Sequence, residues 1–228
     1  MYVMAKDSAV CAKRQAVNQL KAILVTAGPE LRDELRSLSR RRLELACLQL
    51  AEGDDAVDPV ARATRFTVRV LAERVEHLGA QARVLEQRMA EVIATHFPRL
   101  LEAIGVGPHS AAVLLTVLGD NRERMRGEAS FAALCGVSPV EYSSGSRQHR
   151  RLNRGGHRQA NAALHRIVLA RLRWDPRTQA YYERRVAEGK TRREIIRSLK
   201  RYVAREIYRL IDASRSTPGD LRAVRRMS

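Results

Sequence analysis

Aromatic residues are scarce in this chain of 228 residues: they make up 4% of it, with one tryptophan and three phenylalanines. Strands are enriched in aromatic and β-branched side chains, so a core that must be built mainly from Leu, Val, Ile and Ala favours helices. The composition therefore predicts a mainly all-α fold, and the length leaves room for one or two domains.

Cysteine is also sparse. Cys11, Cys47 and Cys135 lie far apart, no CxxC pair occurs, and none stands at zinc-ligand spacing from a histidine. We therefore expect neither a disulfide framework nor a metal site in this chain, and inert thiols in a reducing compartment.

No apolar run approaches the roughly 20 residues that a membrane-spanning helix requires, and no lipidation signal is present. The opening residues, MYVMAKDSAV, are too polar for a secretory signal. The sequence therefore predicts a cytoplasmic protein with no membrane partner.

Acidic residues are few in the last third of the chain. Residues 1–146 hold 19 Lys and Arg against 18 Asp and Glu, whereas residues 147–228 hold 23 against 7, a net charge of +16. A basic excess confined to one region is typical of a surface that faces a polyanion, because the arginines would otherwise repel one another.

Helical periodicity accounts for the first hundred residues. It predicts helices over 9–26, over 29–50 with a possible break near Ser37–Ser39, and over 59–96. The last of these carries a 3-4 apolar spacing typical of a coiled coil. The positions that make this seam are Val68, Leu71, Val75, Leu78, Ala82, Leu85, Met89 and Val92. A helical hairpin within the chain and self-association through this helix both explain the pattern.

A tight turn at Gly105-Val106-Gly107 separates a short helix near Leu100–Ile104 from a second helix over 109–118. This arrangement resembles a helix–hairpin–helix module, in which glycines let backbone amides approach a phosphate at a helix N-terminus. We therefore take these three residues as candidate nucleic-acid contacts. An ordinary corner between two helices is the structural alternative.

The stretch Tyr142–Asn161 combines small hydroxyl residues, glycines and arginines. A hydroxyl beside guanidinium groups suits a phosphate, because the guanidinium fork matches two phosphate oxygens at once. Arginines there can stabilise charge on a reacting phosphate. The candidate nucleic-acid-binding arginines are Arg147, Arg150, Arg151, Arg154 and Arg158.

The C-terminal part reads as a loop or short hairpin over 137–153 and three basic helices. The helices are predicted from Gly155-Gly156 to about Trp174, over 176–188, and from a Thr191–Glu194 capping box to about Ala213. The basic residues of the last helix are expected mostly on its outer face, and they are Arg192, Arg193, Arg197, Lys200, Arg201, Arg205 and Arg209. Residues 214–228 have no core pattern and are predicted to be disordered.

Taken in order, these stretches resemble the RNA-guided transposases of the insertion sequence 110 family over residues 9 to 212. The matching segments include AIGVGPHSAAVLL, FAALCGVSP, SSG, HRRLNRGGHRQANAAL, DPRTQAY and KTRREIIRSLKRYVAREIY. The resemblance implies a C-terminal domain whose serine attacks DNA and becomes covalently joined to it. The matching serine is Ser144, and Ser143 stays open as the alternative.

The same resemblance implies an N-terminal RuvC-like domain that holds Mg²⁺ on acidic residues. This chain begins after the point where those residues would lie, so we expect no cofactor in it. A truncated gene, a start placed too late and a missing half encoded upstream all explain this. The implied partners are double-stranded DNA, a guide RNA and further copies of the chain. The implied setting is the nucleoid of a prokaryotic cytoplasm.

We therefore predict four regions: a helical remnant after the RuvC-like domain (1–56), a long coiled-coil helix (57–97), a transposase domain (98–213) and a disordered tail (214–228). The leading hypothesis is DNA binding and serine-nucleophile strand cleavage and exchange in transposition. Two alternatives are a truncated remnant that binds nucleic acid without catalysis and, from another class, a stand-alone helical nucleic-acid-binding regulator.

Overall fold

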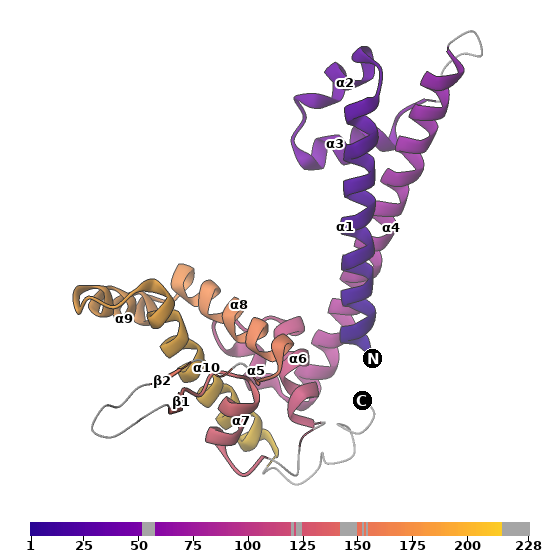
Figure 1. Ribbon diagram of the computed structural model, residues 1–228. Coiled ribbons are helices and arrows are strands. Elements are labelled where there is room, and N and C mark those ends of the chain that lie inside the picture. Colours follow the sequence, from indigo (N-terminus) through magenta and orange to yellow (C-terminus); the bar gives the residue numbers. More distant parts are fainter. Residues whose placement is uncertain are drawn as a thin grey trace. The chain divides into compact units, whose positions relative to one another are not determined.

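The computed structural model describes residues 1–51, 58–119, 121, 125–141, 150–151, 153 and 155–215, with Arg150, Arg151 and Arg215 described by their backbone alone. In this part of the chain the fold is almost entirely helical, which confirms the all-α prediction (Figure 1). The chain forms two compact units that divide within one helix, between Glu86 and Gln87. The four predicted region boundaries stay predictions.

The first unit contains α1 (Tyr2–Thr26), α2 (Pro29–Arg36), α3 (Arg40–Leu48) and the first part of α4 (Pro59–His96). The break predicted near Ser37–Ser39 is present, between α2 and α3. Helix α1 begins at Tyr2, seven residues before the predicted Ala9.

Helix α1 and the first part of α4 run antiparallel to one another in this unit. The Lys6 ammonium lies 3.0 Å from the Glu86 carboxylate, and a side chain added at Gly79 would meet the Lys13 ammonium. Towards the other end of α1, Leu20 shares a buried cluster with residues of α2, α3 and α4. The helical-hairpin alternative is therefore present within the chain, while self-association stays a prediction.

The α4 seam differs in register from the predicted one. Val68 and Val75 are buried as expected, but Leu71 and Leu78 are only partly buried. The positions completing the contact are Ala72 and Gly79, both buried. Small side chains at these two positions let α1 approach closely, a preference that apolar periodicity alone does not express.

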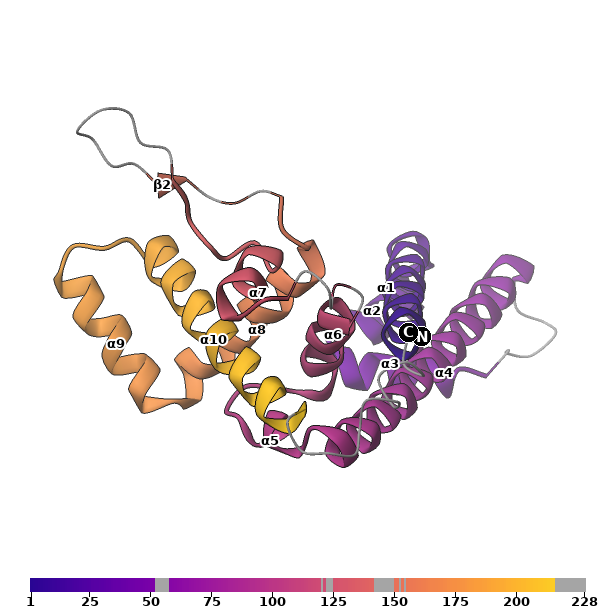
Figure 2. The same ribbon diagram turned by 90° about the horizontal axis from the view of Figure 1, so that it is seen from below.

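The second unit contains α5 (Pro98–Glu102), α6 (Pro108–Gly119), α7 (Glu128–Leu134), β1 (Val140–Glu141) and β2 (Arg150–Arg151), followed by α8 (Arg158–Trp174), α9 (Pro176–Ala187) and α10 (Arg192–Arg215). Helix α6 is apolar on nearly every face and is buried along most of its length, packed against α8. Helix α10 contacts α5, α7, α8 and α9, so it holds the unit together (Figure 2).

The starts of α9 and α10 follow the predicted capping chemistry. Asp175 accepts hydrogen bonds from the Arg177 amide and the Thr178 hydroxyl, and Thr191 and Glu194 form the reciprocal capping box. Helix α10 continues to Arg215, so the first two residues of the predicted tail are helical. Residues 216–228 lie outside the described residues.

Arg171 connects three elements of the second unit. Its two terminal nitrogens donate to both carboxylate oxygens of Glu206 on α10 at 2.6 and 2.9 Å, and its Nε donates to the Ile104 carbonyl at 2.8 Å. Arg171 is only 8% exposed although it is charged. A bidentate pair of this kind fixes both direction and distance between helices.

The thiols agree in part with the expectation. Cys47 and Cys135 are buried, and burial raises the pKa of their thiols to about 11 and about 12, which leaves both protonated and inert. Cys11 is exposed, and all three are unpaired with one another. Among the described residues, no helix combines the length and apolarity needed to cross a bilayer.

Replacing the buried arginine should weaken the second unit. We expect Arg171→Ala to lower the free energy of unfolding by about 2–3 kcal/mol, because it leaves the Ile104 carbonyl without its donor and removes the Glu206 pair. Arg173→Ala, an exposed change on the same helix, is the matched control and should stay within about 0.5 kcal/mol of the wild type. Urea denaturation followed by circular dichroism measures both; equal losses in the two variants would contradict the assigned role.

Candidate functional site

The described residues on either side of the serine segment form a short antiparallel ladder. Val140 of β1 pairs with Arg151 of β2, and Glu141 pairs with Arg150. Of the two structures predicted for 137–153, a loop and a hairpin, these strands support the hairpin. They bring the two ends of segment 142–149 next to each other. Ser143, Ser144 and Arg147 lie in that segment, outside the described residues, and so does Arg154 beyond it.

Gly136 and Gly156, which flank the ladder in the sequence, are in backbone contact. Gly136 follows α7 with φ +68°, a conformation that glycine adopts without strain. A Cβ built on Gly156 would overlap the Cα and amide nitrogen of Gly136, well inside van der Waals contact. Only a residue without a side chain fits at Gly156. The contact joins the segment between α7 and β1 to the segment between β2 and α8, and we call these two segments the stems of the hairpin.

Polar groups from the stem between β2 and α8 donate hydrogen bonds to the carbonyls at the C-terminal end of α7. The His157 amide donates to the Leu134 carbonyl at 2.7 Å, and the Asn153 side-chain amide donates to the Ala133 carbonyl at 3.1 Å. Carbonyls at a helix C-terminus have no partner within the helix. The His157 amide supplies one for Leu134, and the Asn153 amide adds a second donor to Ala133, whose carbonyl also accepts from the Gly136 amide. The hairpin stem thereby serves as the cap of α7.

Asn161, on the first turn of α8, completes this cap. Its side-chain nitrogen donates to the carbonyls of Cys135 and Gly136 at 2.9 and 3.2 Å. Its side-chain oxygen accepts from the Lys200 ammonium of α10 at 2.8 Å. Because the amide donates on one side and accepts on the other, it links the hairpin base to the basic C-terminal helix. We call Gly136, Asn153, Gly156, Asn161 and Lys200 the hairpin clamp.

Lys200 is buried, with 9% of its surface exposed, which corrects its predicted position on the outside of α10. Burial first, and then the positive charge of Arg197, lowers the pKa of its ammonium. The hydrogen bond to Asn161 is the interaction that brings this lysine inward. The sequence pattern of a basic helix predicts that its lysines are exposed. A buried lysine can be recognised only when its hydrogen-bond partner is known.

Arg158 is the candidate arginine whose side chain is described. It is exposed in the first turn of α8, where backbone amides and the helix dipole also favour an anion. The helix starts at Arg158, after the predicted Gly155-Gly156, and His157 caps it by accepting from the Ala160 amide at 3.3 Å. The side chains of Arg150 and Arg151 lie outside the described set.

The predicted phosphate-binding turn is a tight connection between α5 and α6. Gly105 has φ +78°, and a Cβ there would lie 3.0 Å from the Ile167 carbonyl of α8, so this glycine allows close helix packing. Val106 is buried and its amide donates to the Ala103 carbonyl at 3.0 Å. Gly107 has open space around the position of a Cβ. A phosphate contact at this turn stays a prediction.

The clamp residues Asn153 and Asn161 were absent from the sequence-based site. A signal for Asn161 exists: it lies one turn before Leu164 and two before Val168, on a buried face of α8. A polar residue at the start of an apolar helical stripe indicates a buried hydrogen-bond partner. Nothing comparable marks Asn153.

Helix α10 also holds the other end of α7. The Glu128 carboxylate, in the first turn of α7, accepts hydrogen bonds from the guanidinium groups of Arg205 and Arg209 at 2.7 to 3.1 Å. The hydrogen bond from Arg205 is the main reason that the pKa of this carboxyl is lowered. Both ends of α7 are therefore attached to α10, through Glu128 and through Asn161.

Comparison with known proteins finds a family that part of this chain resembles. Residues 98–183 match the family described as "Transposase IS116/IS110/IS902 family". This segment is similar to the transposase domain of that family. It includes the hairpin, the glycine contact and Asn161, while Lys200 lies beyond the matched residues.

Two curated proteins also resemble part of this chain. The chain is 34% identical over 139 residues to "Insertion element IS110 uncharacterized 43.6 kDa protein" of Streptomyces coelicolor, covering 60% of this chain and 34% of that protein. It is 28% identical over 145 residues to "Probable family 20 transposase" of Pseudomonas aeruginosa, covering 59% and 43%. The chain thus spans less than half the length of either relative.

The glycine contact predicts a sharp difference between two adjacent residues. Gly156→Ala forces a methyl group into the Gly136 backbone and should destabilise the second unit by about 1–3 kcal/mol. Gly155→Ala is the matched control, because its Cβ would lie 3.6 Å from the Asn153 side-chain oxygen, an ordinary contact. Thermal unfolding should show a lower midpoint for the first variant alone. Similar midpoints for both variants would show that the stems do not need this contact.

Proposed function

We propose that this chain is the DNA-processing part of an insertion-sequence transposase and that the Ser144 hydroxyl is its nucleophile. The observation that carries the proposal is the ladder of β1 and β2, which joins the ends of the serine segment within the matched transposase domain. A reacting group on a segment anchored at both ends loses less freedom when it meets its substrate.

The proposed chemistry is transesterification at a DNA phosphodiester. The serine oxygen forms a bond to phosphorus, the bond from phosphorus to one deoxyribose oxygen breaks, and that oxygen leaves as a free strand end after taking up a proton. The serine proton passes to a base or to water. The reverse step, with a second strand end as nucleophile, releases the serine and exchanges strands. Arginines beside the hydroxyl stabilise the added negative charge on the phosphate.

The charge distribution supports double-stranded DNA as the substrate. Residues 147–228 carry a net charge of +16, and much of it lies on exposed faces. Arg158 stands at the N-terminus of α8, and Arg193, Arg197 and Arg201 are exposed on α10. Contacts of this kind with phosphates supply affinity that does not depend on sequence.

The rest of the proposed assembly comes from the family resemblance. We propose that a RuvC-like domain, in a longer protein or another subunit, supplies acidic residues for Mg²⁺, and that a guide RNA selects the DNA. In the part of the chain that the structure describes, no group of three or more His, Cys, Asp or Glu side chains is placed to hold a metal. The proposed setting is the prokaryotic nucleoid.

A covalent adduct assay tests the nucleophile. The chain, with the RuvC-like segment added in trans, is incubated with labelled duplexes that span the ends of its insertion element, and denaturing gels report protein–DNA adducts. We expect Ser144→Ala to abolish the adduct and Ser143→Ala to retain it, because only one hydroxyl attacks. Peptide mass spectrometry should locate the modified serine.

Two outcomes would contradict the proposal. An adduct that survives Ser144→Ala and disappears in Ser143→Ala would assign the reaction to the neighbouring hydroxyl. A wild-type chain that binds these duplexes and forms no adduct under any of these conditions would be a binding module without catalysis.

A further inference from the structure

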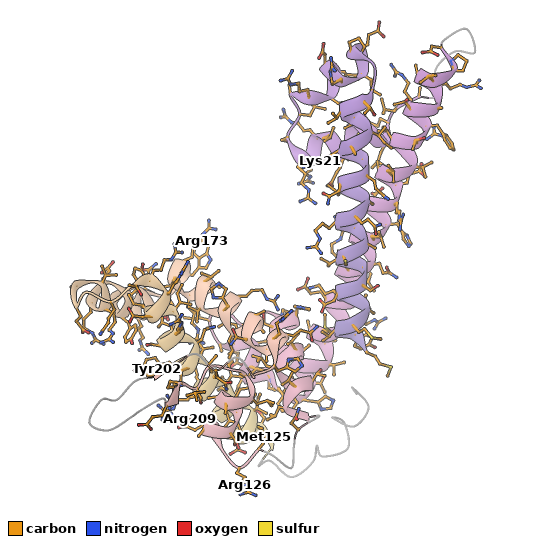
Figure 3. The ribbon with its side chains drawn as sticks, viewed as in Figure 1. Lys21, Met125, Arg126, Arg173, Tyr202 and Arg209 are labelled. Carbon is orange, nitrogen blue, oxygen red and sulfur yellow. The ribbon has the colours of Figure 1, made fainter. Side chains whose placement is uncertain are left out.

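A groove of about 790 Å³ lies where the end of α8 meets α9 and α10, and none of the described hairpin residues lines it. A second hollow of about 400 Å³ shares Tyr202 and Glu206 with it and continues along α10 past Arg205 and Arg209. Tyr202 and Arg209 both project from α10 (Figure 3). The two hollows together form what we call the α10 groove.

Two tyrosines give the α10 groove an aromatic wall. The rings of Tyr181 and Tyr202 meet edge to face, with centroids 5.7 Å apart and planes at 81°. The Arg184 guanidinium lies over the Tyr181 ring, 5.4 Å from its centroid. Tyr202 nevertheless remains 53% exposed, although a neighbouring ring supports it. A ring held in position and left uncovered is suited to stack against a planar ligand.

Charge favours an anionic ligand. The residues that line the groove include five arginines and two carboxylates. The carboxylates are already engaged: Glu206 pairs with Arg171, and Asp175 caps α9. Arg205 and Arg209 share the single carboxylate of Glu128, so their combined charge exceeds that of their partner. The groove therefore has an excess of positive charge along its length.

The combination of ring and cations distinguishes between forms of nucleic acid. Duplex DNA presents phosphates on its outside and keeps the flat faces of its bases stacked inside. An unpaired strand offers base faces and phosphates together, and proteins that bind single strands combine aromatic platforms with a basic groove. An acidic peptide would use the arginines and leave the exposed ring without a planar partner.

We propose that the α10 groove binds an unpaired stretch of nucleic acid, with one base stacked on Tyr202 and its phosphates beside Arg177, Arg184 and Arg205. The inference rests on the proposed action on nucleic acid, and it assigns a second site on the transposase domain and α10. The ligand is a displaced DNA strand or an unpaired RNA segment, which share this chemistry and differ in the sugar.

Fluorescence anisotropy with the full chain tests the site, using labelled oligothymidylate, oligouridylate and a blunt DNA duplex of the same length. We expect Tyr202→Ala to weaken binding of a single strand by roughly tenfold, as expected for loss of one stacked base, and to change duplex binding little. Tyr202→Phe keeps the ring and should retain the affinity. Phe66→Ala is the matched control, because Phe66 is 48% exposed and has Arg69 over its ring but belongs to the first unit.

Arg184→Gln provides a second variant, at the guanidinium that lies over the Tyr181 ring. It should weaken single-strand binding, and circular dichroism should show unchanged helical content. If the variants lose affinity for oligothymidylate alone, the ligand is displaced DNA. If they lose affinity for oligouridylate alone, the ligand is RNA. Equal single-strand affinity for the wild type, Tyr202→Ala and Arg184→Gln overturns the proposal. This binding assay does not require cleavage. A chain that forms no serine adduct but binds single strands in a Tyr202-dependent way would contradict the proposed nucleophile and support the proposed groove.

Discussion

The backbone contact between Gly136 and Gly156 is the constraint on which the candidate site depends. It places the residue that leaves α7 against the residue that enters α8, so the hairpin between them must leave and return at one point. The contact is strengthened by hydrogen bonds from His157 to the last carbonyl of α7 and from Asn161 to the Cys135 and Gly136 carbonyls. Because Asn161 is in turn held by Lys200, the described base of the hairpin is tied to the basic helix α10.

Much of the fold follows from local chemistry and could be predicted. The long helix over 59–96 was located to the residue, since Pro59 starts it and His96 precedes Phe97 and Pro98. The capping box at Thr191 was also predicted correctly. Apolar spacing, proline and capping side chains act within a few residues of the chain. Helix boundaries that depend on them can therefore be predicted without a tertiary structure.

The hairpin clamp could not be predicted in the same way, because its partners lie far apart in the sequence. Lys200 looks like one more surface cation until Asn161, 39 positions earlier, is placed beside it. The pairing of Gly136 with Gly156 is equally hidden, since a glycine signals a turn more often than a backbone contact. In α4 the burial of Ala72 in place of Leu71 has a similar origin: the closeness of α1 decides which face is covered.

Amide hydrogen exchange at His157 measures the clamp most directly. This amide donates to Leu134 across the glycine contact, although the residue itself is exposed. If the two stems stay joined in the native state, the amide of His157 exchanges only when the whole unit unfolds, at the rate of the Ile167 amide in the buried centre of α8. Exchange on the order of 100-fold faster than at Ile167 would show that the stems separate without unfolding, and would contradict the account.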